Sequence, residues 1–303
     1  MPKPILSIVI VSYNSVKFLE NCLKSILKSG LKNNYEIIVV DNASSDGTSS
    51  LMAAKFKKIK YIPNRVNLGF AKANNLGIAG SSGKYVLILN PDTIVPPRTF
   101  SFLIDFMENN PAAGVSTCLV ELQNGKIDDA CHRGFPTPWN AFCHFTFLSR
   151  LFPGSLFFNG YHLGYRNLEK IHQIDSCSGA FMMIRRNVGE KLGWFDEDYF
   201  WYGEDLDFCY RTKKTGFRIY FIPDVKVIHY KGISSGIKKH SRHLSTADKK
   251  IRIASTRARF EVMRIFYRKH FTGRQKKLLT FVIFGIIFIL EKINLLKYKL
   301  YEE

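Results

Sequence analysis

The sequence predicts an α/β fold in which a mainly parallel sheet is flanked by helices. Through the first 110 residues, short runs rich in Ile and Val alternate with stretches of helical periodicity, as βαβ units require. Apolar residues make up 46% of the chain and charged residues 23%, a balance that excludes disordered, collagen-like and polytopic membrane proteins. A length of 303 residues is enough for a full core without disulfides or metals.

The expected elements follow one another in a regular order. Residues 5–13 have the Ile and Val density of a strand, and residues 18–28 carry apolar side chains on one helical face until Gly30 ends the helix. Further strands are expected at 35–41, 59–63 and 84–89, and helices at 47–56, 70–79 and 100–108. Ligands bind at the carboxyl ends of the strands in such sheets, so Asp41 and Asp92, which follow strands, are candidate site residues.

The second half of the chain is less uniform. Residues 121–170 include Trp139 and many Phe residues, which fits either a loop-rich binding region or hydrophobic packing. Regularity returns later, with strands expected at 177–186, 218–222 and 225–230 and a helix at 203–215. From about Ser241 the pattern becomes helical and basic.

The charge is unusual and uneven. The chain has 44 Lys and Arg against 25 Asp and Glu, a net charge of +19. Residues 231–303 hold 18 of the basic and 5 of the acidic residues, so this tail carries +13 and the preceding 230 residues carry +6. So large an excess suggests a polyanionic partner: nucleic acid, phosphates or an anionic membrane.

Cysteine usage and the N-terminus favour a cytosolic compartment. The six Cys residues include no CxxC pair, and the apolar run near the N-terminus has no small-residue cleavage site after it, so it is interpreted as a strand. The pairs Cys131-His132 and Cys143-His144 match no common zinc module. We therefore expect scattered reduced thiols.

One apolar run near the C-terminus could contact a membrane. Residues 278–290 are interrupted only by Thr280 and Gly285. As a helix these 13 residues reach about 20 Å, less than the bilayer core of about 30 Å. A simple transmembrane span is therefore disfavoured, and an interfacial segment, a buried helix or a partner-binding helix remain.

Each candidate motif has a functional and a structural interpretation. Asp41, before a small polar loop, could accept hydrogen bonds from a base or ribose, while Ser45 or Asp46 could simply cap the next helix. Asp92 could bind a divalent cation together with diphosphate oxygens, or belong to a Pro-Asp turn that ends the strand. In the segment 64–75, Gly69 permits close backbone approach, although turn chemistry explains much of the pattern.

Two further motifs lie late in the chain. Glu204, Asp205 and Asp207 crowd a helix start, where acids offset the helix dipole, but repulsion between neighbouring carboxylates also suits a general base. His229 ends an apolar strand and is either a packed residue or the completion of a metal site begun by Asp92.

The order of these motifs resembles glycosyltransferase family 2, which has the GT-A fold, and most of all its rhamnosyltransferase-like members that build bacterial surface polysaccharides such as O-antigen. The resemblance covers about residues 5–232 and rests on six motifs in this order: a strand followed by Ser-Tyr-Asn, Val-Asp-Asn-Ala-Ser-x-Asp-Gly-Thr, Asn-x-Gly-Phe-Ala-x-Ala-Asn-Asn, Leu-Asn-Pro-Asp-Thr, Ser-Gly-Ala-Phe-Met-x-x-Arg and Gly-Glu-Asp-x-Asp-x-Cys-x-Arg. It implies an enzyme that transfers a sugar from a nucleotide-diphosphate donor, with inversion, to a saccharide or polyprenyl-diphosphate-linked acceptor.

The resemblance also implies roles for individual residues. Asn14 and Asp41 would hold the base and ribose, and a second set would line the nucleotide-sugar loop: Asn67, Gly69 and Asn74. Asp92 matches the last Asp of the family's Asp-x-Asp metal motif, whose first position is Asn90 here, and His229 would add a ligand to Mg²⁺ or Mn²⁺. Asp205 matches the catalytic base and Glu204 supports it.

The basic tail is expected to act apart from the chemistry. Residues 256–271 form a basic amphipathic helix before the apolar run, a pairing that favours an anionic membrane surface over packing on the catalytic domain or a second subunit. We therefore expect a GT-A catalytic domain over residues 1–235, a membrane-associating helical region over 236–303, and a cytoplasmic enzyme peripheral to the inner face of the plasma membrane. A homo-oligomer is left open.

Two other functions are compatible with parts of the sequence. The charge alone suggests a nucleic-acid-binding protein, but no reading module is present and base-stacking aromatics are not interleaved with the charges, so no nucleic-acid partner is expected. A nucleotidyltransferase would need a Gly-rich, Lys-bearing phosphate loop after the first strand, and the sequence has none there.

Overall fold

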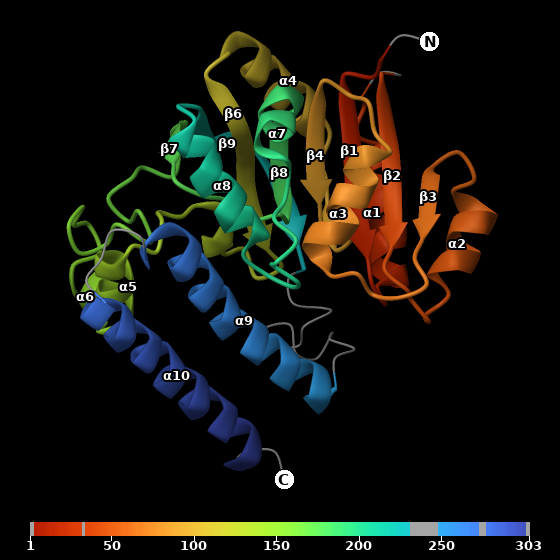
Figure 1. The fold of residues 1–303 in the computed structure, drawn as a ribbon. Helices are drawn as coiled ribbons and strands as arrows, with labels where there is room; N and C mark the ends of the chain where they lie inside the picture. The colour runs from red at the N-terminus through yellow and green to blue at the C-terminus, as the bar shows by residue number, and fades with distance from the viewer. Residues whose placement is uncertain (1–2, 32–33, 231–247, 273–276, 301–303) are drawn as a thin grey trace.

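The structure is a computed structural model that describes residues 3–31, 34–230, 248–272 and 277–300. A single mixed sheet forms its centre (Figure 1), with the strand order β3-β2-β1-β4-β8-β6-β9-β5 and with β7 paired to β9. The predicted α/β fold, with a sheet flanked by helices, is confirmed.

The strands and helices have the following bounds: β1 (Leu6–Ser12), α1 (Val16–Leu27), β2 (Tyr35–Asp41), α2 (Thr48–Lys55), β3 (Lys60–Pro63), α3 (Phe70–Ala79), β4 (Tyr85–Leu89), β5 (Thr93–Ile94), α4 (Thr99–Asn109), β6 (Ala113–Leu122), the 3-10 turn η1 (Asp129–Cys131), α5 (Pro138–Phe145), α6 (Leu148–Leu151), β7 (His172–Ile174), β8 (Phe181–Arg185), α7 (Arg186–Leu192), α8 (Glu204–Lys214), β9 (Arg218–His229), α9 (Lys249–His270) and α10 (Lys277–Leu300).

The parallel part of the sheet matches the sequence prediction. β1 pairs in parallel with both β2 and β4, and β2 pairs in parallel with β3. Every residue of β1 and β4 is buried, because helices cover both faces of these central strands. The carboxyl ends of β1, β2 and β4 therefore lie side by side at one edge of the sheet.

The other part of the sheet differs from the prediction in three ways. β6, at Ala113–Leu122, was not predicted, although it links β8 to β9 near the middle of the sheet. β8 runs antiparallel to both β4 and β6. The two strands expected at 218–222 and 225–230 form one strand, β9. The pairing shifts from Cys118 with Ile222 to Leu119 with Lys226, and the three intervening residues 223–225 are accommodated as an irregularity rather than a turn.

The two C-terminal helices form an antiparallel pair below the sheet, on the side to which the arrow of β2 points (Figure 1). Tyr267 of α9 packs edge-to-face on Phe284 of α10 at 5.9 Å, and Thr256 is hydrogen-bonded to Tyr298 at 3.0 Å. The domain boundary expected at residue 235 lies within residues 231–247, which are outside the described part of the chain.

The helix α10 is longer than the apolar run suggested. It has 24 residues, and its part Lys277–Leu296 is long and apolar enough to cross a membrane by length and composition. The predicted length of this segment is therefore wrong. Lys277 and the residues after Leu290 continue the helix, so its length no longer disfavours a transmembrane span.

All six Cys side chains are buried and none forms a disulfide, as the sequence predicted.

The segment expected to be irregular is mostly loop. Residues 121–170 contain the short helices α5 and α6, joined by Thr146 and Phe147, and loops on either side.

Candidate active site

Several of the predicted site residues lie at the carboxyl ends of strands, and the others lie on the adjoining loops and helices. Asp41 is the last residue of β2, and Asn90 follows β4 directly. His229 is the last residue of β9, and its pairing with Thr93 brings it beside the segment that leaves β4. Asp205 is the second residue of α8. Residues from four distant parts of the chain therefore meet at one edge of the sheet.

Asp41 and Asn14 hold a polar loop between them. Asp41 is 4% exposed; its Oδ1 accepts a hydrogen bond from the Ser44 N–H at 3.0 Å and its Oδ2 accepts one from the Tyr61 hydroxyl at 2.6 Å. Burial, together with this contact, raises the pKa of Tyr61 to about 12. The Asn14 Oδ1 accepts a hydrogen bond from the Ser45 N–H at 2.9 Å, from a left-handed backbone with φ 47°. The loop is thereby fixed beside a buried carboxylate.

Asn42, which the sequence analysis did not select, fixes the neighbouring loop. Its Nδ2 donates to the Asn67 Oδ1 at 2.8 Å and to the Gly69 carbonyl at 3.1 Å, while its Oδ1 accepts from the Leu68 N–H at 2.9 Å. The signal that could have found it is its place directly after Asp41, at the end of a buried strand. Asn67 and Gly69 thus owe their positions to a 3% exposed amide.

Gly69 allows two loops to touch. Its φ is +81°, and a Cβ there would lie 2.5 Å from the Phe200 carbonyl oxygen, so only glycine fits. The same carbonyl accepts a hydrogen bond from the Phe70 N–H at 2.7 Å. Asn74, in the next turn of α3, is fully buried, and its Nδ2 donates to the Phe70 carbonyl at 2.9 Å. The start of α3 therefore contacts the loop that precedes α8.

A buried histidine lies between two carboxylates. The His229 Nε2 is 3.2 Å from the Asp92 Oδ1, and its Nδ1 is 3.3 Å from the Asp128 Oδ2. The Asn90 Nδ2 is 3.3 Å from the same Nε2. Asp128 is 1% exposed and was not predicted, because nothing in the sequence pairs it with a residue 101 positions away.

This arrangement fits a metal ion in part. Burial alone would lower the pKa of His229, but the carboxylates of Asp92 and Asp128 outweigh it and raise the pKa to about 9. Two ligand atoms of one ion with bonds of about 2.0–2.2 Å lie about 3 Å apart, close to the separation of the Asp92 Oδ1 and His229 Nε2. A carboxylate on the far nitrogen of a ligating His is the common way to orient it, and Asp128 occupies that position.

Two protein ligands are not a complete site. Among the described residues, no group of three or more His, Cys, Asp and Glu side chains is arranged to hold an ion. Asp92 and His229 could therefore hold Mg²⁺ or Mn²⁺ only with further oxygen ligands from a bound diphosphate and water.

Glu204 and Asp205 begin α8 in different environments. The Asp205 Oδ2 accepts a hydrogen bond from the Gly179 N–H at 3.1 Å, and its Oδ1 accepts one from the Leu206 N–H at 2.7 Å. Glu204 is 3% exposed, and its Oε2 has no hydrogen-bond partner among the described residues. Burial, reinforced by the charge of Asp205, raises the pKa of Glu204 well above its ordinary value. Glu204 therefore holds a proton more tightly than an exposed carboxyl group does.

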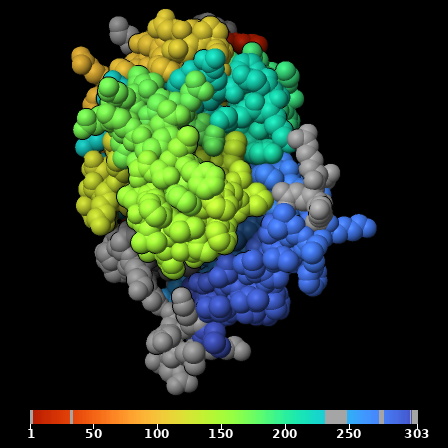
Figure 2. All heavy atoms as spheres, turned by 90° about the vertical axis from the view of Figure 1, so that its left-hand side faces the viewer, coloured from red at the N-terminus to blue at the C-terminus, as the bar shows by residue number. Residues whose placement is uncertain are grey.

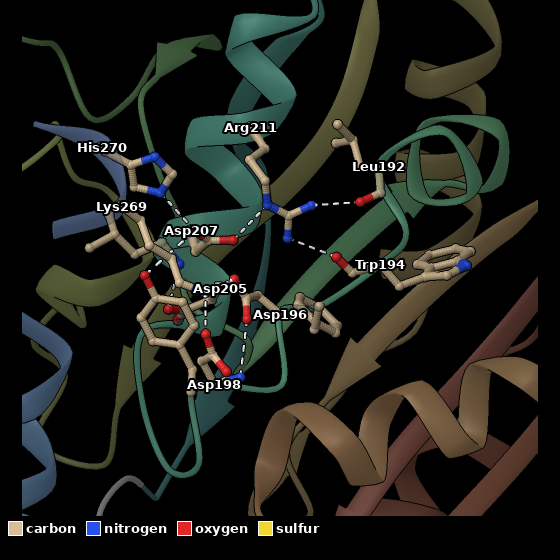
Figure 3. Close-up of polar contacts among 12 residues, drawn as sticks. Leu192, Trp194, Asp196, Asp198, Asp205, Asp207, Arg211, Lys269 and His270 are labelled. Carbon is tan, nitrogen blue, oxygen red and sulfur yellow. Dashed lines mark hydrogen bonds and ion pairs between the residues drawn. The ribbon is translucent and has the colours of Figure 1, made fainter. Parts of the chain in front are cut away.

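Asp207 ties this helix start to its surroundings (Figure 3). Its Oδ2 accepts from the Arg211 Nε at 2.6 Å, and its Oδ1 is 2.7 Å from the His270 Nε2 at the end of α9. Burial would raise the pKa of Asp207, but His270 and Arg211 outweigh it and lower the pKa. The Arg211 guanidinium also donates to the Leu192 and Trp194 carbonyls at 2.8 Å each, which holds the segment before α8.

The helix α9 clamps the same segment from outside. Lys269 forms ion pairs with Asp196 and Asp198 (Figure 3). Gly203, with φ +90°, directly precedes the two carboxylates, and a Cβ there would collide with Val262 of α9. The loop that leads into Glu204 and Asp205 at the start of α8 is therefore enclosed between α3 and α9.

Comparison with known sequences identifies relatives of this chain. The model of the family described as glycosyl transferase family 2 matches residues 7–193. The chain is 28% identical to an N-acetylglucosaminyl-diphospho-decaprenol L-rhamnosyltransferase of Mycobacterium tuberculosis over 257 residues, which are 81% of this chain and 82% of the relative. It is 27% identical to the rhamnosyltransferase WbbL of Escherichia coli over 230 residues, which are 74% of this chain and 82% of the relative.

A solved structure has the same fold. The mannosyltransferase PcManGT from Pyrobaculum calidifontis, in complex with GDP-Man and Mn²⁺, matches with a TM-score of 0.56 and 19% identity. The match covers 88% of this chain and 65% of that one. At this identity the likeness establishes the fold alone.

The clamp at Asp207 predicts a loss of stability in His270→Ala. This change leaves a 1% exposed carboxylate with Arg211 as its main partner, so we expect the free energy of unfolding to fall by about 1–3 kcal/mol. Urea unfolding measures the effect, with Lys250→Ala, an exposed position near the other end of α9, as the matched control. Equal stability of the two variants would contradict the clamp.

The environment of Glu204 predicts a pH-dependent gain in stability. Its carboxyl binds a proton more tightly in the folded than in the unfolded chain, so the wild type loses stability as pH rises from the unfolded pKa of about 4.3 through the raised folded pKa. Glu204→Gln has no proton to lose and should therefore be more stable than the wild type at pH 7, with the difference shrinking toward pH 4. Thermal unfolding at both pH values checks this, and exposed Glu169→Gln should show no such trend.

Proposed function

The chain belongs to glycosyl transferase family 2 and transfers a sugar from a nucleotide-sugar donor, and we propose that the sugar is L-rhamnose and the acceptor a polyprenyl-diphosphate-linked saccharide of a bacterial surface polysaccharide. The names of the two relatives support the sugar, and that of the mycobacterial relative supports the acceptor. The observation that carries the mechanism is the placement of two groups at the sheet edge: the Asp92–His229 pair, and the Asp205 carboxylate held by two backbone N–H groups.

Asp205 is the proposed general base. Its two oxygens accept backbone N–H bonds, which hold the carboxylate in one orientation. Burial raises the pKa of Glu204 beside it. In this orientation Asp205 would take the proton of the acceptor hydroxyl as that oxygen attacks the anomeric carbon. Attack from the face opposite the leaving nucleoside diphosphate gives inversion.

Asp92 and His229 are the proposed metal ligands. They would hold Mg²⁺ or Mn²⁺, and Asp128 would orient the imidazole. When bound, the ion supplies positive charge to the departing diphosphate. Asn90 contributes no anionic ligand, so the donor's diphosphate has to complete the coordination.

The nucleotide is proposed to bind over the ends of β1, β2 and α3. Asn14 and Asp41 border the polar loop that would meet the base and ribose. Asn67 and Gly69, fixed by Asn42, would line the path toward the diphosphate, and Asn74 supports the start of α3 from inside.

The basic C-terminal region is proposed to hold the enzyme on the cytoplasmic face of an anionic membrane. Its net charge of +13 and the exposed apolar side chains of α10 support this association. On this proposal residues 1–235 form the catalytic domain and residues 236–303 the associating region, with α9 serving both through Asp207.

Asp205→Asn tests the function most simply. With dTDP-, UDP- and GDP-sugars as donors, we expect the wild type to release nucleoside diphosphate from dTDP-rhamnose in preference to the others. The variant should lose transfer by at least about 100-fold, since general-base catalysis contributes about 10²–10⁴-fold, and should bind the donor as the wild type does. Asp224→Asn, at an exposed position on β9, is the control. Substantial residual turnover would refute the base assignment, and preference for another sugar would refute rhamnose.

Asp92→Ala tests the metal pair. Because one of two protein ligands is removed, donor binding measured by calorimetry should weaken markedly in the presence of Mn²⁺ and little in its absence. Exposed Asp129→Ala, in the 3-10 turn nearby, should bind as the wild type does. An equal loss with and without Mn²⁺ would show that Asp92 acts without a metal.

A further inference from the structure

Exposed apolar side chains gather on two segments of the chain. Of the 24 large apolar side chains that are exposed among the described residues, 8 lie in residues 138–158, called the aromatic hairpin below, and 9 lie on α10. The aromatic hairpin contains α5 and α6, and its exposed members are these: Trp139, Phe142, Phe145, Phe147, Leu151, Phe152, Leu156 and Phe157. Scattered exposure is ordinary, but clustering on this scale indicates an interaction surface.

The aromatic hairpin is an ordered element rather than a loose loop. The Trp139 Nε1–H donates to the Phe157 carbonyl at 2.8 Å, and the two rings are 4.8 Å apart. At the base of the hairpin the Gly134 N–H donates to the Tyr161 carbonyl at 2.8 Å, and a Cβ on Gly134 would collide with the Gly160 carbonyl. The chain therefore crosses itself tightly and projects a fixed set of aromatic rings.

The aromatic hairpin and α10 lie on the same face of the molecule. Figure 2 shows the yellow-green atoms of the hairpin directly beside the blue atoms of α10, and Figure 1 shows α5 and α6 next to the start of that helix. Burial lowers the pKa of His144 of α5, and the positive charge of Arg259 on α9 lowers it further, which places these two helices close together. The helix α10 packs on α9, but very few of its residues are buried, so its outer surface continues that of the hairpin.

Charge on this face selects the partner. The sequence has no Asp or Glu from residue 130 to 168, and none from 262 to 290. Exposed cations lie within or at the edges of both stretches: Arg150, Arg166, Arg268 and Lys292. An apolar surface with cations and without acids matches the headgroup layer of an anionic bilayer. A second copy of the chain would bring an equal positive charge and be repelled.

We propose that the aromatic hairpin and α10 form one continuous surface that lies in the headgroup layer of an anionic bilayer, with the hairpin as a second membrane contact independent of the C-terminal helix. This deepens the membrane association proposed above and rests on it. Aromatic rings favour the interfacial depth, and exposed Leu side chains add apolar area to bury.

The base of the hairpin lies close to the proposed catalytic base, through Arg133. Arg133 directly precedes the glycine crossing at its base and lies close enough to Asp205 for that carboxyl group to act on its guanidinium. Its Nε is shielded from solvent and has no hydrogen-bond partner among the described residues. A lipid-linked diphosphate that enters along the hairpin would therefore meet a cation on its way to the proposed base.

A fluorescent label on Leu151→Cys tests the contact. The six native Cys side chains are all buried, so an NBD thiol label should react mainly at the introduced cysteine. Vesicles of phosphatidylcholine with phosphatidylglycerol should shift the NBD emission at position 151 to shorter wavelength, as they should for a label on Phe281→Cys of α10. A label on Val66→Cys, which is as exposed but lies on another part of the molecule, should not respond.

A triple variant measures the contribution. Phe147→Ser/Leu151→Ser/Leu156→Ser changes only exposed side chains and should weaken vesicle partitioning at least about tenfold, while Leu27→Ser/Phe102→Ser should not. Release of nucleoside diphosphate from the donor without vesicles should be unchanged in both variants, so failure of the proposed reaction and failure of the lipid contact are read separately.

Two results would overturn the proposal. A lipid response at position 281 with none at 151 would remove the hairpin from the contact. A response at 151 that grows with protein concentration in the absence of vesicles would assign this face to a second copy of the chain instead.

Discussion

The site depends on one buried contact, the placement of His229 between Asp92 and Asp128. Asp92 follows β4 in the nucleotide half of the sheet, whereas Asp128 and His229 belong to the half built from β6 and β9. Because the buried imidazole has a carboxylate within about 3.3 Å of each ring nitrogen, the contact joins the two halves at the edge where a donor diphosphate would arrive. Removing one partner would leave an uncompensated charge in the interior, so the structural and proposed chemical roles of these residues coincide.

A second buried carboxylate, Asp207, positions the proposed base as Asp128 positions the proposed metal ligand His229. It holds the segment before α8 through Arg211 and the end of α9 through His270, so Asp205 is positioned by groups that do not themselves face the acceptor. Since α10 packs on α9, the proposed membrane surface is connected to the proposed base through few side chains. The basic tail first suggested a nucleic-acid partner, but its helix α9 also packs against the segment that carries Asp205 and Asp207.

The sequence was sufficient for features that depend on local patterns. The Ile and Val runs of β1, β2 and β4 predicted a parallel sheet, and the polar residues directly after them, Asp41, Asn90 and Asp92, lie at its carboxyl edge as expected. What it did not reveal depends on distant contacts: the orientation of β8, the strand β6, and Asn42 and Asp128, whose partners are 25 and 101 positions away. The length of α10 was underestimated because its charged ends were read as flanks rather than helix.

A structure of the protein with a nucleoside diphosphate and Mn²⁺ would test the account most directly. The account predicts that the nucleotide lies over the ends of β1 and β2 near Asn14 and Asp41, that the ion contacts Asp92 and His229 together with diphosphate oxygens, and that Asp205 faces the space beyond the diphosphate. A nucleotide at another edge of the sheet, or a manganese ion held away from both Asp92 and His229, would contradict it.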